Sequence, residues 1–235
     1  MAFHYSPKIV TDGLVFLLDA GNPKSYPGSG TVWTDLAGTG KTGTLTNGPT
    51  FSSTKHGSIV FDGSNDYIQT NFTYSLPTIT TNFTAGVWVG GISQSGGTAG
   101  RVILSNYNGT PIPFNLYVRG STNTDPGTFQ GYSRGDSNSA VSVRSTTRID
   151  DDNWHYCVYT KNDNTYTVYI DGVLETSTSA TLGVTTITNN MVLANLNVWF
   201  NQGVVANIAQ TSVHNRALTA TEVLQNYNAT KTRFI

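Results

Sequence analysis

Charged residues are scarce in this chain. Asp, Glu, Lys and Arg together make up 11% of its 235 residues, against roughly 25% in an ordinary soluble domain. Thr, Ser, Asn and Gly take their place, alongside 12 Tyr and 10 Phe. Glu, Lys and Arg fill exposed helix faces, whereas β-branched and aromatic residues favour strands. The composition therefore predicts an all-β chain, and a formal net charge of −1 argues against a nucleic-acid partner.

Cysteines, long apolar runs and a secretion signal are also missing. The single cysteine, Cys157, cannot form an internal disulfide, and its place in a strand-like run predicts a buried, unreactive thiol. No apolar run approaches the ~20 residues of a membrane-spanning helix. Residues 1–8 lack the charged start and apolar segment of a signal peptide. We therefore expect a protein that is made in the cytoplasm and has no membrane partner.

The residues that catalysis usually needs are few. Sugar hydrolysis requires two carboxylates about 5–10 Å apart, yet the chain has only two glutamates, Glu175 and Glu222, and nothing in the sequence selects a pair of aspartates. The four histidines are scattered, and no Gly-x-Ser-x-Gly motif occurs. No paired His or Cys spacing suggests zinc. The sequence predicts a protein without enzyme activity.

One segment imitates a nucleotide-binding loop. Residues 35–42 end in Gly-Lys-Thr, but Asp35 replaces the first glycine of that motif, and its carboxylate would repel a phosphate. Residues 43–49 cannot begin the helix whose N-terminus the phosphate needs. We therefore expect no nucleotide site here.

Strand signals are clearest in the second half of the chain. Apolar residues alternate along residues 154–158 and again along 166–170, and Asp171-Gly172 follows at once. Asp-Gly between two strand-like runs predicts a type I′ hairpin turn, because both central residues need positive φ. With an earlier turn at residues 163–164, the pattern predicts a three-stranded antiparallel meander.

Only one helix is predicted, near the C-terminus. Thr219 and Glu222 have the spacing of a capping box, in which each side chain satisfies a free backbone N–H. Leu218 and Val223 can form a hydrophobic staple around it, and the helix is predicted to end near Tyr227.

No linker or internal repeat divides the chain. We expect a single domain over residues 1–235, with short flexible ends at about 1–8 and 230–235.

An Asp-Gly-Ser-Asn-Asp stretch at residues 62–66 is similar to the start of a calcium loop. Thr73 stands where a helix-loop-helix calcium site needs a glutamate, so a plain hairpin turn is the favoured interpretation. A shallow calcium site could still use one or two Asp side chains with backbone carbonyls. No cofactor is required, and the candidate calcium ligands are Asp62 and Asp66, followed by Asp19 and Asp35.

Aromatic residues beside amides, outside clear strand interiors, are candidates for sugar binding. The ring can stack on a sugar while the amide binds its hydroxyls. Tyr132 lies in a Gly-Tyr-Ser-Arg stretch, and Trp199 and Phe200 precede a turn-like stretch. An alternative stays open for this last pair, which could straddle a strand end with one member in the core. The candidate carbohydrate-binding residues are Tyr107, Asn108, Tyr132, Trp199, Phe200 and Asn201.

Six short motifs follow one another along nearly the whole chain: Asp12-Gly13-Leu14-Val15, Trp33-Thr34-Asp35-Leu36, Phe61-Asp62-Gly63-Ser64-Asn65-Asp66, Trp154-His155-Tyr156, Val168-Tyr169-Ile170-Asp171-Gly172 and Val213-His214-Asn215-Arg216-Ala217-Leu218. Their order resembles that of laminin-G-like, concanavalin A-like jelly rolls. The resemblance implies an all-β, two-sheet antiparallel sandwich with one short C-terminal helix, often with carbohydrate bound at one rim or on the concave face. Sugar-cleaving relatives carry a Glu-x-Asp-x-x-Glu strand that this chain lacks, so the resemblance does not carry enzyme activity over.

The chain also resembles stand-alone versions of this domain among the virion proteins of tailed bacteriophages. That resemblance implies a non-enzymatic, lectin-like structural protein of a virion, as a capsid decoration, tail or fibre component. Its partners would be other virion proteins, copies of itself (a trimer on this resemblance) and cell-surface glycans. The low charge agrees, because interface cores are poor in charged residues. The alternatives are a secreted or cell-surface carbohydrate-binding module and, third, a glycoside hydrolase.

Overall fold

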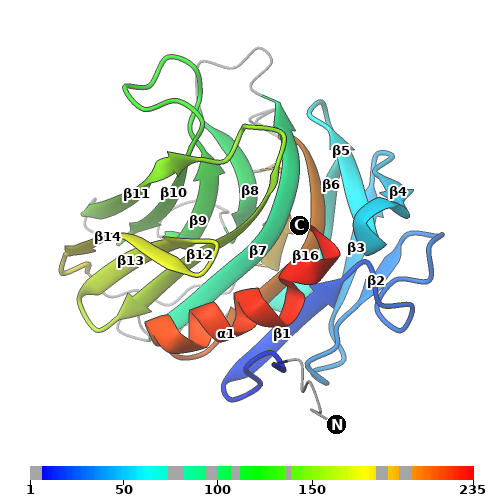
Figure 1. Ribbon diagram of the computed structural model, residues 1–235, viewed down its shortest axis with the longest axis horizontal. Coiled ribbons are helices and arrows are strands. Elements are labelled where there is room, and N and C mark those ends of the chain that lie inside the picture. The colour runs from blue at the N-terminus through cyan, green and yellow to red at the C-terminus, as the bar shows by residue number, and fades with distance from the viewer. Residues whose placement is uncertain are drawn as a thin grey trace, which may run out of the picture.

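Two antiparallel β-sheets pack face to face, and one helix lies across the outside of one of them (Figure 1). The computed structural model describes residues 7–73, 82–93, 100–106, 112–135, 139–183, 190–195 and 203–235. The predicted all-β, two-sheet jelly-roll architecture with a single short C-terminal helix is confirmed. No helix in these ranges is both long enough and apolar enough to cross a membrane.

Sheet A has eight strands in the order β14-β13-β12-β7-β16-β5-β4, and β1 pairs additionally with β16. Its strands are β1 (Leu14–Asp19), β4 (Thr50–Ser52), β5 (Ser58–Asp62), β7 (Phe83–Ser93), β12 (Trp154–Asn162), β13 (Thr165–Ile170), β14 (Val173–Ser179) and β16 (Val205–His214).

Sheet B also has eight strands, in the order β11-β10-β9-β8-β15-β6-β3-β2. Its strands are β2 (Val32–Thr34), β3 (Thr42–Thr46), β6 (Tyr67–Thr73), β8 (Arg101–Ser105), β9 (Ile112–Val118), β10 (Thr128–Arg134), β11 (Ala140–Arg148) and β15 (Asn190–Leu193). The strand at 42–46 confirms that the Gly-Lys-Thr segment leads into a strand and not into a phosphate-binding helix.

The main core lies between the two sheets. Successive side chains of a strand point to opposite faces, so one face of each strand contributes to it. On β7 the contributing residues are Phe83, Ala85, Val87 and Val89, all fully buried. Cys157 is also fully buried in this core, as predicted, and burial raises its pKa well above the usual value.

The predicted meander is confirmed as β12, β13 and β14. Asp171 and Gly172, between β13 and β14, have φ values of 53° and 82°. Positive φ at both positions is what a type I′ turn requires, and Asp and Gly tolerate it better than other residues.

The helix α1 (Ala220–Thr230) begins with the predicted capping box. Thr219 accepts a hydrogen bond from the Glu222 backbone N–H, and the Glu222 side chain accepts one from the Thr219 backbone. Arg216, followed by the Thr219 contacts, holds the pKa of Glu222 down at about 2. The helix ends at Thr230, three residues beyond the predicted end. The Thr230 hydroxyl donates to the Asn226 carbonyl and accepts from the Trp88 indole, which holds this last turn in place.

A second apolar cluster fills the space between α1 and the outer face of sheet A. In Figure 1 the red helix crosses in front of β7 and β16. Leu218 and Val223, the predicted staple, are both buried in this cluster. Its members are Val10, Trp88, Tyr156, Val158, Tyr169, Ala209, Leu218, Val223 and Phe234, with Trp154 and Tyr227 packed against them.

The C-terminal residues correct a prediction. Residues 230–235 were expected to be a flexible end, but Phe234 is 2% exposed and stacks on Trp88, with ring centroids 4.4 Å apart. Arg233 donates two hydrogen bonds of 2.8 Å to the Asp19 carboxylate at the end of β1. The contacts come from residues far away in the sequence, which is why local composition did not reveal them. Residues 1–6 of the predicted flexible N-terminus lie outside the described residues.

Glu175 joins the neighbouring edges of the two sheets. From β14 of sheet A, its carboxylate accepts hydrogen bonds from the backbone and hydroxyl of Thr146 and of Thr147 on β11 of sheet B, at 2.6 to 3.1 Å. Partial burial raises the pKa of Glu175, but these hydrogen bonds outweigh it and hold the pKa below its usual value. The residue therefore has a structural role.

We expect Glu175→Gln to lower the free energy of unfolding by about 1 kcal/mol, because the amide keeps one acceptor oxygen and the site is partly screened by water. The folded-state pKa is depressed, so this stabilisation is present above the unfolded pKa and is lost as pH falls through the folded value. Urea unfolding at pH 7 and in acid measures the difference. A gap between variant and parent that persists in strong acid would contradict this role.

Candidate glycan-binding site on sheet B

Five of the six residues predicted to bind carbohydrate lie outside the described residues: Tyr107, Asn108, Trp199, Phe200 and Asn201. The structure describes only Tyr132. It lines a shallow pocket of about 260 Å³ on sheet B together with Gly100, Tyr117, Arg119, Asn123 and Gln130.

Tyr132 lies inside strand β10 and not in a loop, which corrects the prediction. The preceding residue, Gly131, faces the core in the middle of the strand. A Cβ atom on Gly131 would come within 2.6 Å of Tyr159 Cγ from sheet A. The glycine is thus needed for the close approach of a ring across the sandwich.

Strand alternation places Tyr117 and Tyr132 on the outer face of sheet B. On β9 the fully buried Phe114, Leu116 and Val118 face the core, so Tyr117 faces outward. In the register of β9 and β10, Tyr117 is opposite Gln130 and Tyr132 is opposite Asn115. The two tyrosines are therefore diagonal neighbours on one face.

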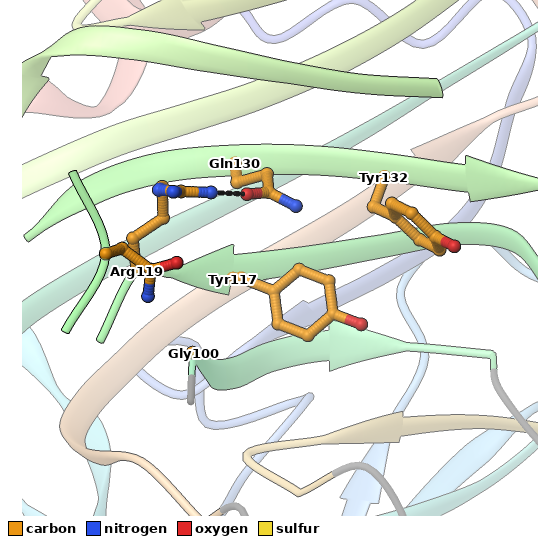
Figure 2. A pocket seen from close by; sticks show the side chains of 6 residues that line it. Gly100, Tyr117, Arg119, Gln130 and Tyr132 are labelled. Atoms are coloured by element: carbon orange, nitrogen blue, oxygen red, sulfur yellow. Dashed lines mark hydrogen bonds between the residues drawn. The ribbon is translucent and has the colours of Figure 1, made fainter. Parts of the chain in front are cut away.

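The two rings stand edge to face. Their centroids are 6.4 Å apart and their planes meet at 71°, and Figure 2 shows both side chains projecting over the same part of the sheet. Asn115 donates a hydrogen bond of 2.8 Å to the Tyr117 hydroxyl, which helps to hold this ring. Both tyrosines are half-buried, so each keeps part of its ring accessible to a ligand.

Arg119 orders the polar side of the pocket. Its guanidinium donates to Gln130 Oε1 at 2.5 Å, drawn as the dashed line in Figure 2, and its Nε lies 2.6 Å from Asp125 Oδ1. The same residue begins the loop between β9 and β10, where its backbone pairs with Thr128 and Gly127 at 2.9 Å. This loop carries Asn123, so the hydrogen-bonded backbone positions that amide at the pocket rim.

Sequence reasoning missed Tyr117, Arg119 and Gln130. The available signal was alternation: residues 114–118 and 129–132 alternate between apolar or small residues and polar or aromatic ones. That pattern predicts strands with one solvent-exposed face, but it does not show that these two strands are neighbours.

The chemistry of the pocket suits binding. Two aromatic rings, two amides and one arginine offer stacking area and hydrogen bonds to hydroxyl groups. None of the six described lining residues carries a carboxylate. The two glutamates of the chain lie elsewhere, Glu175 in its contact with β11 and Glu222 at the helix cap beside Arg216.

The first pair of candidate calcium ligands closes a turn between β5 and β6. Asp62 accepts a hydrogen bond from the Ser64 backbone, and Asp66 accepts one from the Asp62 backbone. Burial raises the pKa of Asp66. The hydrogen bond from the Asp62 backbone lowers it and the Asp62 charge raises it, and the net shift is upward. These contacts are those of a hairpin turn, the favoured interpretation. Calcium binding here stays a prediction.

The other two candidates are held by protein donors. Asp19 forms the ion pair with Arg233 and also accepts from Gln210. Asp35 accepts backbone hydrogen bonds from Leu17, Ala37 and Thr39. Among the described residues, no group of three or more His, Cys, Asp or Glu side chains is arranged to hold a metal ion.

Two histidines lie in strands and are hydrogen-bonded to other groups of the protein. His155 lies between Asp171 at 2.8 Å and Asp151 at 3.0 Å. Burial lowers the pKa of His155, but the two carboxylates outweigh it and raise the pKa above its usual value. His214 bonds to the Val10 carbonyl at 3.0 Å.

The solved structures with a similar fold include binding domains of toxins. The binding domain of Paraclostridial Mosquitocidal Protein 1 has a TM-score of 0.74 and 16% identity, with 93% of this chain and 52% of that chain covered. The receptor binding domain of botulinum neurotoxin D has a TM-score of 0.71 and 14% identity, with 92% of this chain and 52% of that chain covered. The botulinum neurotoxin serotype D ligand binding domain in complex with N-acetylneuraminic acid has a TM-score of 0.70 and 14% identity, with 93% of this chain and 51% of that chain covered. This chain thus spans about half the length of each, and at such identities the likeness shows the fold alone.

Family membership rests on the sequence itself. None of the curated protein sequences compared with this chain is similar to it. A family model described as "Concanavalin A-like lectin/glucanases superfamily" matches residues 62–224, which is more than half of the chain. This range includes every lining residue of the pocket on sheet B. The two-sheet jelly roll and the matched residues agree with the predicted resemblance, and the chain belongs to the concanavalin A-like lectin/glucanase superfamily.

Proposed function

We propose that this protein is a non-catalytic, lectin-like module that binds a glycan in the pocket on the outer face of sheet B. The observation that carries the proposal is the pair Tyr117 and Tyr132, which stand edge to face beside the ordered amide of Gln130. The outer face of sheet A differs, because α1 and Phe234 cover its aromatic residues.

Stacking and amide contacts together are how proteins commonly hold a sugar ring. A tyrosine ring provides a flat apolar surface for the C–H face of a pyranose, and amides pair with the hydroxyls around its edge. Gln130 and Asn123 flank the tyrosines at suitable positions for this pairing. The structural relative solved with N-acetylneuraminic acid supports the idea that chains containing this fold bind sugars.

Binding without cleavage is proposed because the described lining of the pocket offers no carboxylate pair. The nearest acidic group to the arginine, Asp125, forms an ion pair with it.

The finer proposal places this module on a bacteriophage particle, as a capsid decoration, tail or fibre component that contacts other virion proteins or copies of itself. It is supported by the resemblance in motif order and by the low surface charge. Mass spectrometry of purified particles tests it, and a protein found in the lysate but missing from the particles would contradict it. A secreted carbohydrate-binding module remains the alternative, favoured if the protein is recovered from the medium of intact cells.

Glycan binding is tested by replacing Tyr132. We expect Tyr132→Ala to weaken sugar binding at least about tenfold, because an aromatic contact of this kind is worth ~1–2 kcal/mol. Binding of the parent protein is first located on a glycan array and then measured by calorimetry. Tyr67→Ala is the matched control, since Tyr67 is also half-buried but lies on β6, four strands along sheet B from β10. Equal losses in both variants, or no binding by the parent, would reject the site.

A further inference from the structure

Arginine is concentrated in one part of this chain. Five of its seven arginines lie between residues 100 and 150, together with three aspartates. This stretch therefore has two more positive than negative charges, although the formal net charge of the whole chain is −1. This stretch forms β8 to β11, the strands around the pocket on sheet B. The five are Arg101, Arg119, Arg134, Arg144 and Arg148.

One carboxylate, that of Asp125, forms ion pairs with two of these arginines beside the pocket. Asp125 lies 2.6 Å from Arg119 Nε and 3.7 Å from Arg144 Nη1. A single negative charge cannot neutralise both guanidinium groups, so among the described residues of this stretch one positive charge is in excess. The shorter contact belongs to the buried Arg119, whereas the side chain of Arg144 is 45% exposed. The excess charge is therefore accessible mainly at Arg144.

The register of the strands places Arg144 in line with Gln130 and Tyr117. Arg144 on β11 is opposite Gln130 on β10, which is opposite Tyr117 on β9. Adjacent strands are about 4.8 Å apart, so the row from Tyr117 to Arg144 spans about 10 Å. A sugar ring stacked on the tyrosine can extend a substituent along this row past Gln130 toward Arg144.

The row presents hydrogen-bond donors. Arg119 donates a hydrogen bond to the side-chain carbonyl oxygen of Gln130. In Figure 2 the Gln130 amide nitrogen points away from Arg119, on the side of the two tyrosines. An amide NH₂ group and a guanidinium both donate, and a guanidinium has no acceptor at all. A carboxylate is the complementary partner, since it only accepts and its two oxygens match the fork of an arginine.

We infer that the pocket selects glycans that carry a carboxylate, as in sialic and uronic acids. The ring stacks on Tyr117 and Tyr132, and the carboxylate accepts hydrogen bonds from Gln130 Nε2 and Arg144. Arg144 acts as the residue that determines this specificity. The inference rests on the proposed glycan binding and names the sugar class that the same pocket takes.

The test compares matched sugars by calorimetry: sialyllactose with lactose, and trigalacturonate with its methyl ester. We expect each carboxylated sugar to bind at least about tenfold more tightly than its neutral counterpart, with an advantage that shrinks as NaCl rises. Arg144→Gln is expected to abolish this advantage, so that each carboxylated sugar binds no more tightly than its neutral counterpart. Arg148→Gln removes the same charge from the same strand, but Arg148 is paired with Asp150 and lies opposite Thr128 and not opposite Gln130, so this variant keeps the advantage.

Other outcomes would contradict the carboxylate preference, the role of Arg144 or the proposed function. Neutral and carboxylated sugars that bind equally, both weakened by Tyr132→Ala, contradict the inference and leave the proposed function intact. A sulfated lactose that binds while sialyllactose and trigalacturonate do not contradicts the carboxylate assignment. Equal losses for Arg144→Gln and Arg148→Gln show an effect of overall charge and contradict the role of Arg144. The absence of binding to any sugar rejects the proposed function together with the inference.

Discussion

Replacing Trp88 by alanine is expected to lower the free energy of unfolding by about 4 kcal/mol, because a fully buried aromatic side chain is lost and the site cannot collapse. Trp88 stacks between Tyr156 of β12, Tyr227 of α1 and Phe234, with ring centroids 4.4 to 5.7 Å away. Its indole also donates a hydrogen bond of 2.8 Å to Thr230. One side chain therefore joins the helix and the C-terminal residues to sheet A.

Chemical denaturation measures the loss, and amide hydrogen exchange locates it. We expect amides of α1 to lose protection more than those of β9 and β10, because only the second cluster is opened. Leu224→Ala is the control: it removes an apolar side chain from α1 itself, but Leu224 is 43% exposed and its loss should cost below about 1 kcal/mol. A Trp88→Ala protein within about 1 kcal/mol of its parent would show that the cluster does not hold the helix.

Gly131→Ala is expected to cost about 3 kcal/mol, although alanine is ordinarily well tolerated in place of glycine. The added Cβ would lie 2.6 Å from Cγ and 2.7 Å from Cε2 of Tyr159. That ring cannot move away, because it is fully buried and its hydroxyl is hydrogen-bonded to Ser133 at 2.9 Å. Strand β10 must shift instead, at the cost of overpacking. Since β10 carries Tyr132 and Gln130, sugar binding should weaken as well.

A double-mutant cycle separates this clash from other effects of the glycine. In a Tyr159→Leu background the ring is absent, so Gly131→Ala should cost less than about 1 kcal/mol. The stability of all four proteins is measured by urea unfolding. A cost for Gly131→Ala that is the same in both backgrounds would mean that the glycine serves strand geometry and not the approach of Tyr159.

Several elements could be predicted because their signals are local. The capping box at Thr219, the Asp171-Gly172 turn and the alternation along residues 166–170 each lie within a few consecutive residues, and all three are confirmed. The prediction was wrong where the deciding contact is distant. The helix continues to Thr230 because Trp88, far away in the sequence, bonds to it, and Phe234 is buried by the same residue.

The sequence by itself determined the all-β class, the position of the C-terminal helix and the family, because periodicity and motif order can be read directly along the chain. It also identified Tyr132 as a candidate. Only the tertiary structure decided what surrounds that residue. Tyr117, Gln130 and Arg144 become its neighbours through the register of three strands, and Gly131 allows a strand there because a ring from the other sheet needs the space. Register and packing across the sandwich depend on pairs distant in sequence, and no local pattern encodes them.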